Sequence, residues 1–349
     1  MSLFDFTNDD ELQRFITYNK IFQSVTTCKI HYCVNLSYKV LDKLVKLLYN
    51  LTTIKFVNCV GLIRLPDSFK NLRKLKNLYI SRCYNFKKMP ASIRELHNLE
   101  EITINYCDAL ETLDGTIENC VNLKILNIYR CSKLRHIFRS VVNCLKLEHL
   151  DIAFCDALTN LTHKFSILQN LTTLSLDECN ALPTFTDDIS MLKNLTTLYI
   201  YNCKILSSTV LPSSICFCIK LQLISVNNIN MLPPSMLYLP NLNKIRKVDY
   251  IRHDDNFEDD FDDLTFTYDI NDIRTQWRDM INPGSGTSRD TVTNDDDDEM
   301  PDLLESMVPD PDVIYGCKNT IHLPESISNL FGLTTLEISD DDDGLPDLI

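Results

Sequence analysis

The chain has 349 residues with a hydrophobic share of 44%, 34 Lys and Arg, and 48 Asp and Glu. This hydrophobic share is normal for a chain that folds around a core. No apolar stretch approaches the roughly 18 residues needed to span a bilayer, so we expect no membrane role. The net charge of −14 disfavours nucleic acid as a partner.

The first eleven residues, MSLFDFTNDDE, contain no basic region, apolar stretch or small-residue cleavage site. They do not resemble a secretory signal, so we expect a cytoplasmic protein, with the nucleus as the alternative location. In a reducing compartment the 14 Cys should be thiols rather than disulfides. Residues 1–24 precede the first repeated segment and are interpreted as an N-terminal cap.

A phrase of the form LxxLxIxxC recurs within residues 25–248. The first clear copy runs from Leu51 to Cys59 and the last from Leu195 to Cys203, each 24 residues after the one before. Apolar residues that alternate with period two form a strand with one buried face. A single coil cannot bury that face alone, so coils must stack and pair their strands in a parallel sheet. The segment is predicted to be a solenoid of about ten coils.

The Cys of this phrase occupies one position in eight coils, where the chain leaves the strand. A small side chain with a weak S–H donor suits a buried turn, because it can satisfy carbonyls of adjacent coils. Zinc sites need about four convergent ligands at CxxC or HxxxH spacings, which the chain lacks, so we expect no metal and no cofactor. The predicted structural ladder comprises Cys33, Cys59, Cys83, Cys107, Cys131, Cys155, Cys179 and Cys203.

A second phrase places Pro66, Pro90 and Pro212 at one point of their coils, each three residues ahead of an apolar side chain. With both phrases combined, a unit such as Asn77–Leu99 resembles the leucine-rich-repeat family. It is most similar to the LxxLxLxxCxxLxxLPxxIxxL variant of plant intracellular immune receptors and of some large DNA viruses. The resemblance implies an α/β solenoid, a horseshoe with a parallel sheet on its concave face and an irregular or short-helical convex side.

The periodicity stops near residue 248 and resumes near residue 313. Residues 249–312 contain the acidic runs DDNFEDDFDD and DDDDE and few aliphatic side chains, so they are interpreted as a largely disordered insertion. Residues 313–339 read as terminal repeat units and residues 340–349 as an acidic tail. The balance of charge is +9 over residues 1–248 and −23 over residues 249–349. The acidic arm either screens part of the solenoid or is a solvated spacer.

The sequence offers no pattern typical of catalysis. It lacks a nucleophile elbow, a Gly-rich phosphate loop ahead of a helix, and the spacing of a calcium loop. We therefore expect no enzymatic activity and no small-molecule substrate.

The solvent-facing positions of the predicted strands are rich in Tyr and Arg, which the core does not need. These residue types dominate the energetics of protein interfaces. The alternative is that Tyr is present for its strand propensity on an exposed sheet. The predicted partner-binding residues on the concave face are Tyr79, Arg82, Tyr106, Tyr129, Arg130, Phe154, Tyr199 and Tyr201.

The sequence favours a non-catalytic scaffold that recognises a protein partner through its concave face. Two alternatives stay open. One is an acidic-armed binder, or chaperone, of basic proteins such as histones. The other is an adaptor subunit that presents substrates to a ubiquitin ligase or a phosphatase.

Overall fold

The computed structural model of the chain describes residues 2–17, 24–137, 141, 143–159, 167–182, 185, 187–203, 210–226, 229–248 and 265–268. The chain divides into two units, Met1–Pro283 and Gly284–Ile349, and the described residues all lie in the first. The predicted terminal repeats at 313–339 and the acidic tail at 340–349 lie outside the described residues. None of the described helices is long and apolar enough to cross a membrane.

A strand and a helix close the first end of the solenoid. Strand β1 (Ser2–Phe6) pairs in parallel with β2 (Val25–His31), and helix α1 (Asp9–Thr17) follows β1. The Phe15 ring packs edge-on against Phe4 with ring centroids 4.8 Å apart. The Asp9 carboxylate accepts hydrogen bonds from the backbone N–H groups of Val34 and Asn35, which fixes the helix to the first coil. The apolar end of the stack is thereby covered.

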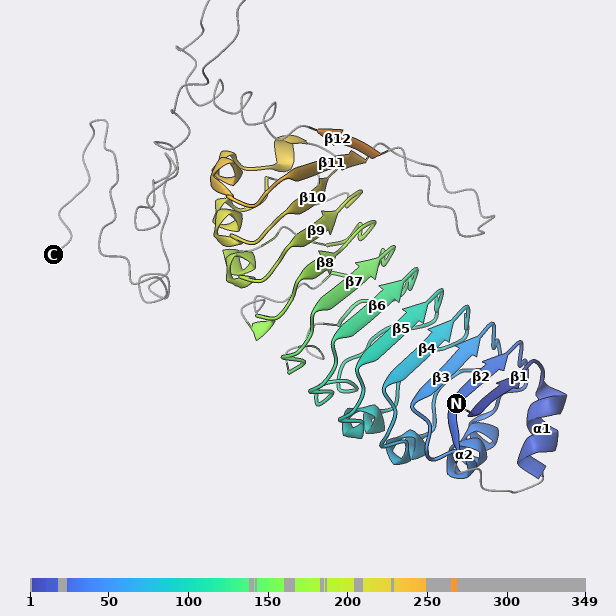
Figure 1. Cartoon of the computed structure of the whole chain (residues 1–349). Helices are drawn as coiled ribbons and strands as arrows, with labels where there is room; N and C mark the ends of the chain where they lie inside the picture. The colour runs from blue at the N-terminus through green and yellow to red at the C-terminus, as the bar shows by residue number, and fades with distance from the viewer. Residues whose placement is uncertain are drawn as a thin grey trace, which may run out of the picture. The chain divides into compact units, whose positions relative to one another are not determined.

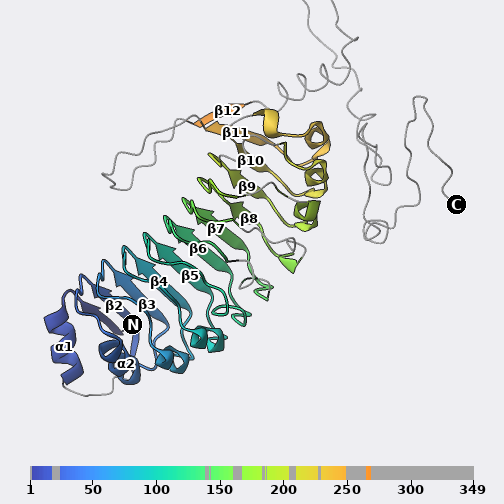
Figure 2. The same ribbon diagram turned by 180° about the vertical axis from the view of Figure 1, so that it is seen from behind.

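One strand of each coil enters a single sheet, in which β1 to β11 are parallel and follow chain order (Figure 1). Seen from behind, the strands form the same uninterrupted row (Figure 2). This arrangement confirms the predicted parallel sheet. The strands after β2 are β3 (Thr53–Val57), β4 (Asn77–Ser81), β5 (Glu101–Asn105), β6 (Ile125–Tyr129), β7 (His149–Ala153), β8 (Thr173–Ser175), β9 (Thr197–Ile200), β10 (Leu223–Val226) and β11 (Lys244–Val248).

The core is a set of straight rows of identical or similar apolar side chains. Ile104, Ile128 and Ile152 are register partners in β5, β6 and β7, and each is at most 1% exposed. Burying one Ile or Leu side chain stabilises a fold by roughly 1.5–3 kcal/mol. Because each row is shared between neighbouring coils, the apolar face of a coil is buried only when the next coil is in place.

The side opposite the sheet is built from short helical turns, as predicted. Helix α2 (Tyr38–Leu47) covers the first coil. Several later turns begin directly after a Pro, whose fixed φ leads the chain into the turn. The 3-10 turns are η1 (Asp67–Asn71), η2 (Ala91–Glu95), η4 (Asp187–Met191), η6 (Ser213–Phe217), η7 (Ile229–Met231) and η8 (Pro234–Tyr238).

The last strand was not predicted from the sequence. Residues 249–312 were expected to be a largely disordered insertion, and β12 (Thr265–Tyr268), which lies in that range, pairs antiparallel with β11. The sequence TFTY combines β-branched and aromatic residues, which favour strands. The exposed edge of β11 provides unpaired backbone groups, and β12 satisfies them.

Gly61 is required by the close approach of two coils. A Cβ at this position would overlap the backbone of Val34 and Leu36 in the preceding coil. We expect Gly61→Ala to lower the free energy of unfolding by about 1–3 kcal/mol, because the coils must separate slightly. Val60→Ala, at an exposed neighbouring residue, serves as control and should change it by less than about 0.5 kcal/mol. Equal denaturant midpoints for the two variants would contradict this explanation.

Candidate functional site

Each strand from β2 to β9 leads into a corner with left-handed backbone conformation. The corner residues have φ values of 51–57°. None is Gly, although bulky side chains rarely adopt this conformation and it costs roughly 1–2 kcal/mol per residue. The eight corner residues are Tyr32, Asn58, Arg82, Tyr106, Arg130, Phe154, Glu178 and Asn202.

Hydrogen bonds to the next coil hold these corners in place. The backbone N–H of Tyr106 donates to the carbonyl of Tyr129 at 2.8 Å, and that of Arg130 donates to Ala153 at 3.0 Å. Phe154 donates in the same way to Asp177 at 2.9 Å. The corner is thus a continuation of the sheet ladder, and the inter-coil hydrogen bonds offset the conformational cost.

The residue after each corner is the repeated Cys. The structure places Cys33, Cys59, Cys83, Cys107, Cys131, Cys155, Cys179 and Cys203 with no exposed surface. Many of these thiols donate to a carbonyl of the preceding coil, as Cys179 does to Ile152 at 3.2 Å. Burial raises the pKa of Cys131 well above its ordinary value. Among the described residues, no cluster of His, Cys, Asp and Glu forms a metal site.

Burial predicts a clear order of thiol reactivity. Cys216 is half-buried, whereas the other described cysteines are buried. We expect a short pulse of iodoacetamide on the folded protein to alkylate Cys216 well before the eight ladder positions, because alkylation needs an accessible thiolate. Peptide mass spectrometry after the pulse measures this order. Early alkylation of Cys131 or Cys155 in protein that stays folded would contradict the buried ladder.

The eight predicted binding residues occupy three different positions of the coil. Tyr79 and Tyr199 lie in the middle of their strands, and Tyr129 and Tyr201 lie two residues before the ladder Cys. The other four are corner residues: Arg82, Tyr106, Arg130 and Phe154.

Five of these residues form one contiguous group, which we name the aromatic–arginine cluster: Arg82, Tyr106, Tyr129, Arg130 and Phe154. The Tyr129 ring packs edge-on against Tyr106 at 5.5 Å and against Phe154 at 4.9 Å between centroids. The guanidinium carbon of Arg130 lies 5.5 Å from the Tyr106 ring and 5.1 Å from the Phe154 ring. Arg82 lies 5.8 Å from the Tyr106 ring. Cation–π contacts of this kind contribute about 0.5–1 kcal/mol each at exposed sites.

The remaining three predicted residues have other surroundings. The Tyr79 hydroxyl donates to Glu101 Oε2 at 2.6 Å, and Lys55 Nζ lies 4.2 Å from the Tyr79 ring centroid. Burial, together with the Glu101 carboxylate, raises the pKa of Tyr79. Tyr199 and Tyr201 belong to the coil of β9, two strands beyond Phe154.

A carboxylate that the site prediction left out lies beside the cluster. Asp151 is in the middle of β7, between Asn127 of β6 and Ser175 of β8. Burial of the carboxyl raises its pKa, against the opposing effect of a hydrogen bond from Ser175. Its Oδ1 is buried and accepts no hydrogen bond from any described residue. The sequence shows only an Asp at a strand position, and this pattern is equally typical of a carboxylate exposed to solvent.

Asp151 should therefore reduce stability at neutral pH. We expect Asp151→Asn to raise the free energy of unfolding at pH 7, on the order of 0.5 kcal/mol for a partly exposed carboxyl. The native state binds a proton at the Asp151 carboxyl more tightly than the unfolded chain does. The extra stability of Asp151→Asn over the wild type therefore shrinks as pH falls through the raised pKa. It should vanish below about pH 3.9, the usual unfolded value.

Urea unfolding at several pH values measures the difference in free energy of unfolding between Asp151→Asn and the wild type. Asp108→Asn is the matched control, at an exposed carboxylate in the turn after Cys107 that accepts a hydrogen bond from Ser132 Oγ at 3.1 Å, and it should show little change. A destabilised Asp151→Asn at pH 7 would show that the carboxylate is favourably paired, contrary to this account.

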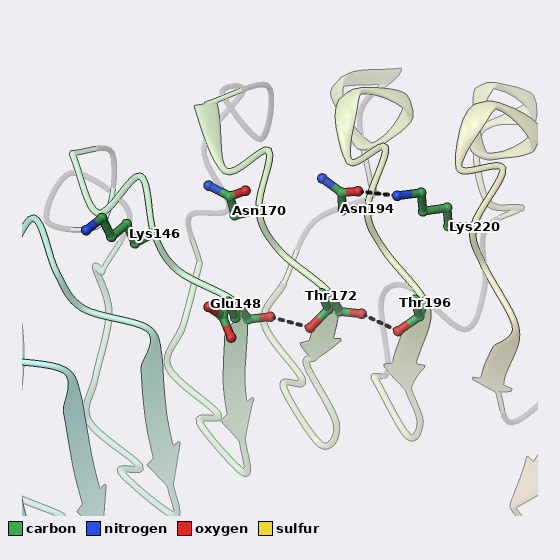
Figure 3. A pocket seen from close by; sticks show the side chains of 7 residues that line it. All are labelled: Lys146, Glu148, Asn170, Thr172, Asn194, Thr196 and Lys220. Carbon is green, nitrogen blue, oxygen red and sulfur yellow. Dashed lines mark hydrogen bonds between the residues drawn. The ribbon is translucent and has the colours of Figure 1, made fainter.

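A shallow hollow of about 500 Å³ lies at the opposite ends of the strands, where the chain enters β7, β8 and β9 (Figure 3). Lys220 Nζ donates to Asn194 Oδ1 at 2.7 Å, and Asn194 Nδ2 donates to the Gln169 carbonyl at 2.7 Å. Asn98 and Asn122 make the same contact in earlier coils. The hollow is therefore part of the repeating architecture. Its lining residues are Lys146, Glu148, Asn170, Thr172, Asn194, Thr196 and Lys220.

Comparison with known proteins agrees with the repeat register. Residues 63–184 match the family model described as plant disease resistance protein RPS2-like, leucine-rich repeats. A search of curated protein sequences found no match.

Similar solved structures include the leucine-rich repeat domain of the type III effector XopL, at 24% identity and a TM-score of 0.49. That likeness covers 62% of this chain and 72% of the other. A leucine-rich-repeat protein of Leptospira interrogans is 17% identical, with a TM-score of 0.34 over 64% of this chain and 78% of its own. The Drosophila Toll–Spatzle complex is 19% identical, with a TM-score of 0.46 over 64% and 33%. The 24-residue register, the parallel sheet and the family-model match over residues 63–184 together show that the chain has the leucine-rich-repeat fold.

Proposed function

We propose that this protein is a non-catalytic scaffold that binds a protein partner through the aromatic–arginine cluster. The leucine-rich-repeat fold is typical of protein-interaction scaffolds, and an open sheet face leaves room for a large ligand. The main support for the proposal is the type of residue found at the four central left-handed corners.

Of the four outer corners, two hold Asn58 and Asn202, and Asn is among the residues that tolerate the left-handed conformation best. The other two hold Tyr32 and Glu178. The four central corners instead hold two Arg and two aromatic residues, for which this conformation is less favourable. Their side chains are not needed to fill the core, because the buried rows lie on the other face of the strands. A binding role explains why these positions carry side chains that folding does not require.

The chemistry of the cluster suits recognition of another protein. Tyr, Phe and Arg are enriched among the residues that contribute most to protein interfaces. Stacking of Arg130 on Phe154 and Tyr106 limits the rotamers that these side chains adopt before binding. A partner that contacts a preordered group loses less conformational entropy on association.

Proximity labelling tests the proposal. The full chain is fused to a biotin ligase and compared with a triple variant, Tyr106→Ala, Tyr129→Ala and Arg130→Ala. Truncating several hot-spot residues costs more than 2 kcal/mol, so labelling of true partners should fall by about tenfold or more.

A matched triple variant changes the same residue types outside the cluster: Tyr49→Ala, Tyr84→Ala and Arg94→Ala. All three side chains are exposed, so this variant should keep the wild-type labelling pattern. Both variants should show the circular dichroism spectrum of the wild type. Labelling that is unchanged by the cluster variant, including recovery of basic proteins such as histones, would overturn the proposal.

A further inference from the structure

Charges on the sheet face lie in two separate groups. The basic pole consists of Lys29, Lys55 and Arg82, from the coils of β2, β3 and β4. The acidic pole consists of Asp151, Asp177 and Glu178, from the coils of β7 and β8. Most of the aromatic–arginine cluster lies between the two poles, on the coils of β5, β6 and β7.

Two further charges lie between the poles, the Glu101 carboxylate on β5 and the Arg130 guanidinium of the cluster, and they are opposite in sign. The Glu101 carboxylate accepts hydrogen bonds from the hydroxyls of Tyr79 and Thr103, at 2.6 and 3.3 Å. Lys244 and Arg246 belong to β11, three strands beyond β8. His31 contacts Asp5 of the cap at 3.2 Å. The face therefore remains basic toward its first coils and acidic around β7 and β8.

The two poles are separated by a regular distance. Lys55 on β3 and Asp151 on β7 are four strands apart, and the corners Arg82 and Glu178 are also four coils apart. Strands in a sheet are spaced about 4.8 Å apart, so each pair spans about 19 Å. An extended segment advances about 3.3 Å per residue and covers that span in about six residues.

Two buried acceptor oxygens, one between the poles and one within the acidic pole, lack a donor among the described residues. Asn105 Oδ1 on β5 and Asp151 Oδ1 on β7 accept no hydrogen bond from any described residue. They lie on either side of β6, which carries Tyr129. A buried acceptor without a donor costs about 1–3 kcal/mol. Because these oxygens have almost no exposed surface, a ligand lying across β5 to β7 can donate to them, from its backbone N–H groups or from a cationic side chain, only after the surrounding side chains rearrange.

We propose that the ligand is an extended segment of a protein partner that carries an acidic and a basic side chain about six residues apart, with an apolar or aromatic side chain between them. The acidic side chain meets the basic pole, the basic one meets the acidic pole, and the apolar one packs on the aromatic–arginine cluster. This inference rests on the proposed function and specifies the partner chemistry of the same surface. Complementary charges fix the register of such a segment and disfavour a uniformly charged polymer.

Selection from a random peptide library tests the inference without a known partner. A library of twelve-residue peptides is displayed on phage and selected on the immobilised full chain. Enriched peptides should carry Asp or Glu and Lys or Arg five to seven residues apart, with an aromatic or aliphatic residue between. Enrichment of peptides with one sign of charge only, or no enrichment over a blank surface, would overturn the inference.

A charge-reversed variant provides a more specific test. Lys55→Glu with Arg82→Glu makes the basic pole acidic, so it should select peptides with Lys or Arg near both ends. It should also bind synthetic wild-type-selected peptides at least about tenfold more weakly by fluorescence anisotropy. Lys70→Glu with Arg94→Glu makes the same changes on exposed 3-10 turns opposite the sheet and should select the wild-type peptides.

The outcomes separate this inference from the proposed function. If the charge-reversed variant selects the same peptides as the wild type, the pole assignment is wrong. If it does so while the cluster variant still loses partner labelling, the binding surface stands and only its charge pattern is misassigned. Binding of single-stranded RNA that is lost in the Lys55→Glu and Arg82→Glu variant would also contradict the inference.

Discussion

The fold depends on the contact between one coil and the next. Each strand bonds to its neighbours along a parallel ladder, and each Leu or Ile row is buried only because the adjacent coil supplies the next member. The cap strand β1 and the antiparallel strand β12 continue the same ladder at its two ends. Stability in such an array is a sum of nearest-neighbour terms, so the geometry of one coil fixes the geometry of the next.

The same ladder explains how the candidate site is held. The corner N–H groups bond to the following coil, and the Cys thiols bond back to the preceding one. These bonds keep Tyr, Arg and Phe in a left-handed conformation that they rarely adopt alone. The result is a row of aromatic and cationic side chains at fixed spacing along the rim of the sheet. The side chains in this row differ from coil to coil while the backbone conformation stays the same. The surface can therefore change its chemistry without a change in the fold.

Much of this could be predicted from the sequence, because alternation and a 24-residue period together determine strand, face and register. The left-handed corners could not, since Tyr106 and Phe154 carry none of the usual Gly or Asn signals. The burial of Asp151 was also hidden, because it depends on Asn127 and Ser175 of neighbouring strands. Strand β12 was missed because the acidic composition around Thr265–Tyr268 dominates that window, and its pairing depends on the free edge of β11.

Amide hydrogen exchange at the corners tests this account most directly. The N–H groups of Tyr106, Arg130 and Phe154 donate to the next coil, so they should exchange as slowly as the amide of Ile128 within β6. Exchange of these three amides at the rate of an unstructured peptide, with Ile128 still protected, would show that the corners are not part of the ladder. The side chains of the aromatic–arginine cluster would then have no fixed spacing.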